Sequence, residues 1–166
     1  RKLISGEIRW VRPEGIHLTL KFFGDITAAD VENIAVATQE AAAGERPFSL
    51  AVGGAGVFPD PRRPRVLWLG MNGDVERLLL FQTRLEQALQ RIGFPREERP
   101  FRPHLTLARI KDSRSLAGLG RALEQGEQYQ AGRFAAAGLS LMQSELGPGG
   151  AVYRQLKWFP FTGQTG

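Results

Sequence analysis

The sequence predicts an α+β fold of two similar, pseudo-symmetric lobes, each a mainly antiparallel sheet with helices on its outside, around a central cationic cleft. One observation is composition: 166 residues, of which 42% are hydrophobic and 23% charged, suffice for one compact domain with a hydrophobic core. The other is an internal repeat, in which segments of the same kind recur in each half. A unit of half this length is too small to bury a core alone, so we expect one bilobal domain over residues 1–166.

The repeat is clearest around two identical tetrapeptides. An Arg-x-apolar-Arg-Pro segment occurs at 9–13 and at 99–103, and each copy precedes a His-Leu-Thr-Leu motif, at 17–20 and at 104–107. The first half inserts Glu14-Gly15-Ile16 before its histidine. In the second half a strand and a helix come before this segment. We therefore expect the first lobe to lack its N-terminal strand and helix in this sequence, about 25 residues by comparison with the second copy.

Periodicity and breaker residues predict the individual elements. Thr27 followed by Asp30 is typical of a helix start, and Gly44 of the stop of that helix. A stripe of apolar residues predicts a second helix over 74–92, and a third, short one is expected over 113–124. Six Gly and Pro residues predict a loop over 53–64. Apolar, β-branched and aromatic runs predict strands at 8–11, 16–23, 48–52, 65–71, 104–110, 129–134, 139–143 and 152–159.

Composition also excludes several classes of protein. The chain has no cysteine, which excludes disulfides, iron–sulfur clusters and thiolate zinc sites. No apolar run approaches the roughly 18 residues that a membrane-spanning helix needs. The formal net charge is +5, and 18 of the 22 basic residues are Arg, the side chain that grips phosphate with two parallel hydrogen bonds. This balance indicates an anionic partner.

His17 and His104 are the only histidines, and each begins one of the two tetrapeptides. Successive side chains of a strand point to opposite faces, so His17 shares a face with Thr19, and His104 with Thr106. The leucines of each motif point to the other face, where they can anchor the strand. We expect the pseudo-two-fold relation to bring the two His/Thr pairs across one cleft.

Two facing imidazoles suit in-line displacement at phosphorus. The attacking and leaving oxygens occupy opposite apices, so one group must accept a proton while another donates one. Imidazole does either at neutral pH. The two threonine hydroxyls would bind the equatorial oxygens, where negative charge accumulates.

Three other interpretations of the histidines fit the pattern less well. Duplication of a core could leave two structural histidines, but identical frames with paired threonines argue against it. Two histidines without cysteine or two well-placed carboxylates do not make a zinc site. No motif supports a serine or cysteine nucleophile. We therefore expect acid–base catalysis with no metal and no cofactor.

Paired His-x-Thr-x motifs in a duplicated fold resemble the two-histidine phosphoesterase superfamily. The flanking residues are similar to one branch in particular, the RNA 2',3'-cyclic phosphodiesterases, also called 2'-5' RNA ligases. Besides the motifs, the resemblance rests on the stretches 9–11, 21–24, 56–59, 64–70, 99–103 and 108–109.

This resemblance implies a hydrolase that opens a terminal RNA 2',3'-cyclic phosphate to a 2'-phosphomonoester without a metal. It implies His17 as the proton donor and His104 as the proton acceptor. The partners would be RNA or oligonucleotide ends, with no membrane, for a monomeric cytoplasmic enzyme. Two alternatives stay open: 2'-5' RNA ligation or cleavage of 2'-5' oligonucleotides at the same site, and a non-catalytic module that binds RNA ends.

Four further residues are candidates around this centre. Lys21 has the parity of His17 and Thr19, which would make it a phosphate ligand alongside the two threonines. Arg109 matches an arginine that the family uses near the phosphate, but strict alternation puts it on the opposite face from His104 unless the strand ends or twists at Ala108. Phe58 and Phe101 are candidates for stacking on a base, as aromatic side chains do with single-stranded RNA.

Overall fold

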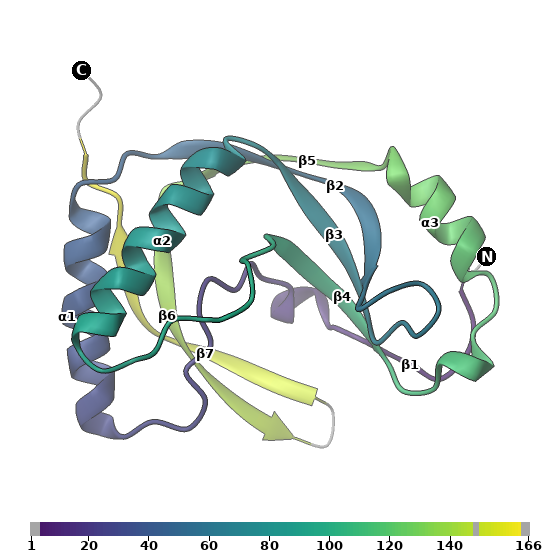
Figure 1. Ribbon diagram of the computed structural model, residues 1–166, viewed down its shortest axis with the longest axis horizontal. Coiled ribbons are helices and arrows are strands. Elements are labelled where there is room, and N and C mark those ends of the chain that lie inside the picture. The colour runs from purple at the N-terminus through teal and green to yellow at the C-terminus, as the bar shows by residue number, and fades with distance from the viewer. Residues whose placement is uncertain (1–3, 148–149, 164–166) are drawn as a thin grey trace. The chain divides into compact units, whose positions relative to one another are not determined.

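The computed structural model describes residues 4–147 and 150–163 (Figure 1). The described chain divides into two compact units, and each is assembled from three separate stretches. The first unit contains residues up to 19, 51–73 and 103–133, and the second contains 20–50, 74–102 and the chain from 134 onward. Because each unit takes residues from both halves of the sequence, its core depends on contacts between distant segments.

The first unit is built on a five-stranded sheet with the strand order β1-β4-β3-β2-β5. Strand β4 pairs antiparallel with both of its neighbours, β1 and β3. Strands β2 and β5 continue from this unit into the second one. The strands are β1 (Ile8–Trp10), β2 (Phe48–Phe58), β3 (Val66–Gly73), β4 (His104–Ile110) and β5 (Gln130–Ala136).

A small apolar core anchors the strands of the first unit. Ile4, Val57, Leu67 and Ala108 are buried together, and Ala108 is fully buried. Helix α3 (Leu119–Glu127) contributes Leu119, Ala122 and Leu123, which pack against this cluster. The core therefore holds β3 and β4 in place from one side of the sheet.

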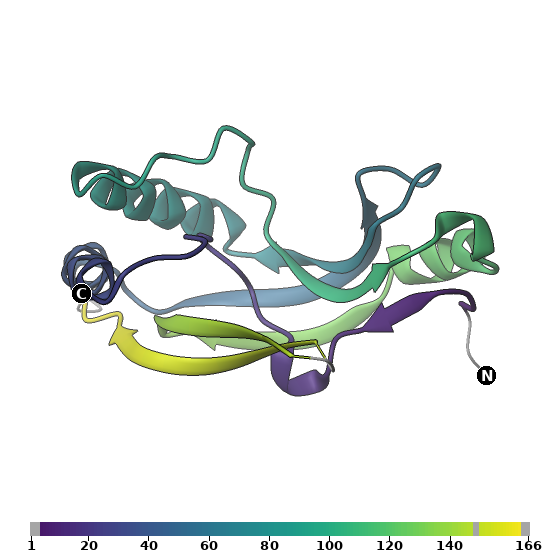
Figure 2. The same ribbon diagram turned by 90° about the horizontal axis from the view of Figure 1, so that it is seen from below.

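The second unit combines two helices with a hairpin. Helix α1 (Ala28–Ala43) lies beside helix α2 (Val75–Arg91), as both views show (Figures 1 and 2), and α1 also contacts the hairpin. The hairpin consists of β6 (Gly138–Gly147) and β7 (Gly150–Pro160), which pair antiparallel. The ring of Phe161 stacks on Phe48 and meets the fully buried Phe81 edge-on, with ring centroids 5.7 and 4.9 Å apart.

The predicted ends of the first helix are confirmed. The Thr27 hydroxyl accepts a hydrogen bond from the backbone N–H of Asp30, whose carboxylate accepts from the backbone N–H of Thr27. This reciprocal capping satisfies two amides that the first turn leaves without helical partners. Gly44 is the C-cap. Helix α2 also lies where the apolar stripe predicts it.

Three predicted boundaries are wrong. Residues 16–23 do not form a strand, because their pairing is limited to an isolated bridge at Leu18. Strand β2 continues to Phe58, through all three of the glycines that predict a loop. The predicted helix over 113–124 is divided into a 3₁₀ turn, Ser113–Ser115, and α3, because Gly118 takes a left-handed conformation (φ 81°) between them.

The predicted class is confirmed: antiparallel sheets combine with separate helices in an α+β fold. None of the helices in the described part of the chain is both long enough and apolar enough to span a membrane.

Candidate active site

Strand β4 carries the second motif on one face of the sheet. Across the ladder, His104 is opposite Gly70 and Thr106 is opposite Trp68 of β3. Residues opposite one another in a ladder point to the same side of the sheet. His104, Thr106 and Trp68 therefore share one face, and both motif side chains are half-buried.

Two aromatic rings hold the imidazole of His104. The ring of Phe58 meets it edge-on, with centroids 4.9 Å apart, and the Trp68 centroid is 6.4 Å away. Phe58 and Trp68 also contact one another, at 5.0 Å. Within the described residues, Trp68 Nε1 is the one buried side-chain polar atom without a hydrogen-bond partner. The residues of this cluster limit the rotation of His104.

The main chain orients the imidazole of His17. Residues Pro13–Gly15 form a 3₁₀ turn, and the Gly15 carbonyl lies 2.8 Å from Nδ1 of His17. A carbonyl only accepts hydrogen bonds, so Nδ1 carries a proton and the second nitrogen, Nε2, is the one that exchanges a proton. Two of the residues inserted in the first repeat, Glu14 and Gly15, thus belong to the turn that fixes this ring.

An isolated antiparallel bridge between Leu18 and Leu105 brings the two motifs together. Because the bridge is antiparallel, His17 lies toward the Thr106 side of it and Thr19 toward the His104 side. Although 17–20 is not a strand, His17 and Thr19 are exposed while Leu18 is half-buried, as alternation requires. All four side chains belong to the first unit.

A β-bulge in β4 places Arg109 on the face of His104 and Thr106. The register shifts between two adjacent β3 residues: Trp68 is opposite Thr106, whereas Leu67 is opposite Ala108, so β4 has one extra residue at this point. Beyond the bulge, Arg109 is opposite Val66, which shares a face with Trp68. The change of face that we expected for Arg109 is therefore present. It comes from an extra residue within a continuous strand and not from the end of the strand.

Arg9 joins this face, and the sequence does not predict it as a site residue. It lies directly opposite Arg109 in the pairing of β1 with β4, and both side chains are exposed. Two guanidinium groups facing one another repel, so an anion between them would be stabilising. The recurrence of Arg9 in the repeat is the available sequence signal, but the pairing with Arg109 needs the sheet.

Lys21 belongs to the second unit, where it forms a buried ion pair. Its ammonium donates to Glu86 Oε2 at 3.1 Å and to the Pro95 carbonyl at 2.6 Å, and its side chain is 6% exposed. The parity that relates Lys21 to His17 fails because residues 16–23 form no strand. The role of Lys21 as a phosphate ligand stays a prediction, and such a role would require the ammonium to leave Glu86. Phe101 is half-buried in the loop before β4, and its role in base stacking stays a prediction.

Metal ligands do not gather in the described ranges, 4–147 and 150–163. They contain no group of three or more His, Cys, Asp or Glu side chains placed to hold an ion. The first unit holds two imidazoles, two hydroxyls and the cationic side chains of Arg9 and Arg109, groups that suit proton transfer at an anionic centre.

Comparison with known proteins identifies the family of this site. The model of the LigT-like phosphoesterases matches two consecutive stretches, 1–68 and 69–153, one around each His-Leu-Thr-Leu motif. This chain belongs to the LigT-like phosphoesterase family. The resemblance carried by the paired motifs is thereby confirmed.

Relatives of this LigT-like chain match it over most of its length. It is 35% identical to the RNA 2',3'-cyclic phosphodiesterase of Methanothermobacter thermautotrophicus, over 95% of this chain and 85% of that protein. It is 34% identical to the enzyme of the same name from Aeropyrum pernix, over 90% of this chain and 84% of that protein.

Solved structures share the LigT-like fold. A Thermus thermophilus protein superposes with a TM-score of 0.79 at 28% identity, covering 96% of this chain and 85% of that one. E. coli LigT in complex with 3'-AMP gives a TM-score of 0.74 at 25% identity, covering 94% of this chain and 82% of that one.

Proposed function

We propose that this chain hydrolyses terminal 2',3'-cyclic phosphates of RNA to 2'-phosphomonoesters, with His17 and His104 as the acid–base pair. The observation that carries the proposal is the isolated bridge between Leu18 and Leu105, which brings the two His-Leu-Thr-Leu motifs side by side within the first unit. The names of the curated relatives support the substrate class.

The reaction needs two proton transfers on opposite sides of one phosphorus atom. Neutral His104 takes a proton from a water molecule while the oxygen of that water attacks phosphorus. Protonated His17 gives its Nε2 proton to the 3'-oxygen as the P–O3' bond breaks, and the phosphate stays on the 2'-oxygen. Each transfer is worth about 10²–10⁴-fold in rate. After product release, proton exchange with solvent restores both rings.

The remaining side chains of this face stabilise developing charge. The hydroxyls of Thr19 and Thr106 donate hydrogen bonds to the non-bridging oxygens, which carry more charge in the transition state. Arg109, brought to the same face by the bulge, adds a guanidinium. One copy of the chain suffices for this chemistry, since both motifs belong to one unit.

Phe58 contacts the His104 ring directly, and this contact comes before any stacking on an RNA base. Its ring already meets the imidazole edge-on at 4.9 Å, so its first role is to position the proton acceptor. Stacking of Phe58 on the terminal RNA base stays part of the proposal, since a part of the Phe58 ring that does not contact His104 could take that contact.

The test is turnover of a nucleoside 2',3'-cyclic phosphate with identification of the product. We expect the 2'-monoester, and we expect His17→Ala and His104→Ala each to lower kcat by at least about 100-fold while oligonucleotide affinity is kept. Thr19→Ala and Thr106→Ala lower kcat by smaller factors. Thr83→Ala is the matched control, because this hydroxyl of α2 donates to the Leu79 carbonyl of its own helix.

Unchanged turnover in both histidine variants would remove the acid–base assignment. Binding of cyclic-ended RNA by the wild-type chain without any turnover would instead identify a module that binds RNA ends.

A further inference from the structure

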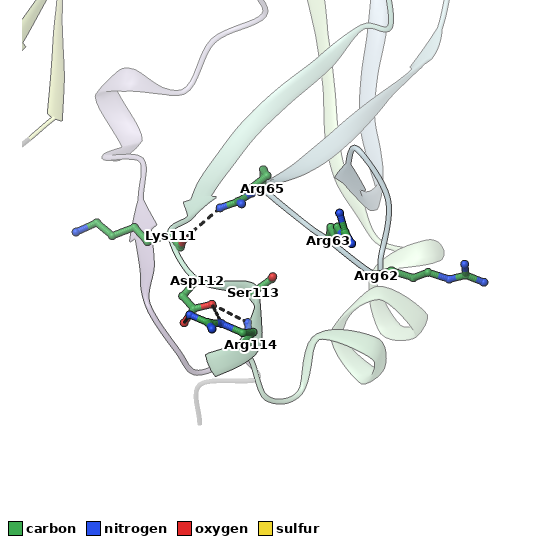
Figure 3. Close-up of a pocket in the computed structure, with 7 residues that line it drawn as sticks. All are labelled: Arg62, Arg63, Arg65, Lys111, Asp112, Ser113 and Arg114. Carbon is green, nitrogen blue, oxygen red and sulfur yellow. Dashed lines mark hydrogen bonds and ion pairs between the residues drawn. The ribbon is translucent and has the colours of Figure 1, made fainter.

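A basic hollow lies in the first unit, at the far end of β4 from His104. Its volume is about 560 Å³, and Figure 3 shows the side chains around it. Five of the seven lining residues are cationic and one is a carboxylate. They are Arg62, Arg63, Arg65, Lys111, Asp112, Ser113 and Arg114.

Two loops form the hollow, and the sheet fixes both. The loop between β2 and β3 is closed by a hydrogen bond from Arg65 N to the Phe58 carbonyl, at 2.7 Å. Asp60 Oδ1 accepts from the backbone amides of Arg62 and Arg63, at 2.8 and 3.2 Å. The segment after β4 is tied to this loop, because Arg65 Nη1 donates to the Lys111 carbonyl at 3.2 Å. The cationic side chains therefore project from an ordered frame.

The one carboxylate of the hollow is already paired. Asp112 accepts from the Arg114 guanidinium at 3.1 and 3.3 Å, and Figure 3 shows Arg114 folded back onto it. Arg62, Arg63 and Arg65 are exposed, as is Lys111. Clustered like charges repel one another, so the hollow has a surplus of positive charge that an anion would offset.

Further cations lie along β4 between His104 and the end of the strand where the hollow lies. From His104 to Ile110 the strand spans about 20 Å. Arg109 and Arg9 lie on the face of His104 within this span. A chain of phosphates that begins at the two histidines and follows β4 would pass these guanidinium groups before it reaches the end of the strand where the hollow lies.

We propose that the basic hollow binds the phosphodiester backbone of single-stranded RNA several nucleotides from the cyclic end. This inference rests on the proposed function. It assigns the enzyme a preference for oligonucleotides over mononucleotides, because only a longer substrate reaches both places. Backbone contacts carry no base information, so the preference is for length and not for sequence.

The test compares Arg62→Gln/Arg63→Gln with the wild-type chain on substrates of increasing length. The substrates are a nucleoside 2',3'-cyclic phosphate and a series of oligonucleotides with a cyclic end. We expect kcat/KM for long substrates to fall at least about ten-fold more than for the nucleoside, and the slope of log affinity against log salt to flatten by about 0.7 per lost phosphate contact. Arg91→Gln/Arg96→Gln, which changes two exposed arginines of the second unit, is the charge-matched control.

Two results would overturn the inference. One is an equal fall of kcat/KM for all substrate lengths, which would place the hollow in the reaction centre or show a general defect. The other is no change in the length dependence or the salt slope. If the wild-type chain has no turnover at all, the proposed function fails. Fluorescence anisotropy with a labelled oligonucleotide then tests the hollow alone, and weaker binding by the double variant supports it.

Discussion

His17 and His104 are held by different means. A backbone carbonyl, from Gly15, fixes the tautomer of His17, whereas the rings of Phe58 and Trp68 restrict His104. A carbonyl that accepts from Nδ1–H leaves Nε2 as the nitrogen that exchanges a proton, which a proton donor and a proton acceptor both require. Restricted rotation suits the proton acceptor, because that ring must meet one attacking water in one geometry. The single-residue environments thus orient both rings, and the assignment of donor and acceptor stays a proposal.

Gly56 permits the position of the Trp68 indole. A Cβ at Gly56 would lie 2.2 Å from the indole ring, so Gly56→Ala must displace it. We expect a loss of about 1–3 kcal/mol in the free energy of unfolding. Turnover falls as well, because Trp68 and Phe58 hold His104. Thermal unfolding and kcat measure the two effects.

Gly120→Ala is the matched control for this substitution. Gly120 lies in α3, and nothing is within 4 Å of a Cβ built there. We expect a neutral effect or a gain of up to about 1 kcal/mol, since alanine is the better helix former. Equal melting temperatures of the two variants would contradict the packing described around Trp68.

At the scale of elements, a β-bulge positions Arg109 and an ion-pair cluster positions helices α1 and α2. The bulge of β4 moves Arg109 to the face of His104 and Thr106 while Ala108 and Ile110 stay buried in the core. In the second unit, Glu45 follows α1 and pairs with Arg77 and Arg84 of α2. This carboxylate is 7% exposed, and it ties the two helices together.

Acid should weaken the contact between α1 and α2. Burial raises the pKa of Glu45, but hydrogen bonds from Arg77 and Arg84 outweigh it and hold that pKa below its ordinary value. A carboxyl whose pKa is lowered by folding stabilises the protein above its ordinary pKa, and this contribution is lost as the pH falls through the lowered value. Both arginines are partly exposed, so the expected contribution is about 1–2 kcal/mol.

The measurement is the melting temperature from pH 7 to pH 3. We expect Glu45→Gln to melt lower than the wild type at pH 7 and to lose less stability on acidification. Glu32→Gln, an exposed change on α1, serves as the control. Parallel curves for the wild type and Glu45→Gln would show that this pair does not contribute to acid sensitivity.

At the scale of the whole molecule, the two units contain different features. The first unit contains both His/Thr pairs, Arg109 and the basic hollow. The second contains α1, α2 and the hairpin, with the buried pair of Lys21 and Glu86 among its contacts. All groups that the proposed reaction uses are side chains of this chain.

Turnover is therefore expected to persist in excess EDTA. Proton transfer is assigned to imidazoles, and charge stabilisation to hydroxyls and guanidinium groups, so removal of divalent ions leaves each step in place. The check is kcat/KM on a nucleoside 2',3'-cyclic phosphate before and after dialysis against chelator. Loss of turnover that Mg²⁺ or Zn²⁺ restores would contradict the assignment.

The sequence by itself determined the class of fold, the caps of α1, the extent of β4 and the composition of the two His/Thr pairs. These features depend on local order: alternation along a strand, a hydroxyl three residues before an acid, and a motif that occurs twice. The paired motifs also carried the resemblance to the family, which the comparisons confirm.

Only the tertiary structure decided which side chains share the face of His104 and Thr106. The bulge that turns Arg109, the pairing of Arg9 with Arg109 and the burial of Lys21 against Glu86 all involve residues far apart along the chain. Strand register and ion pairing depend on the partner segment, which local periodicity does not contain. For the same reason, residues 16–23 form no strand although their apolar and polar side chains alternate as in one. A strand needs a pairing partner along its whole length, and these residues pair at Leu18 alone.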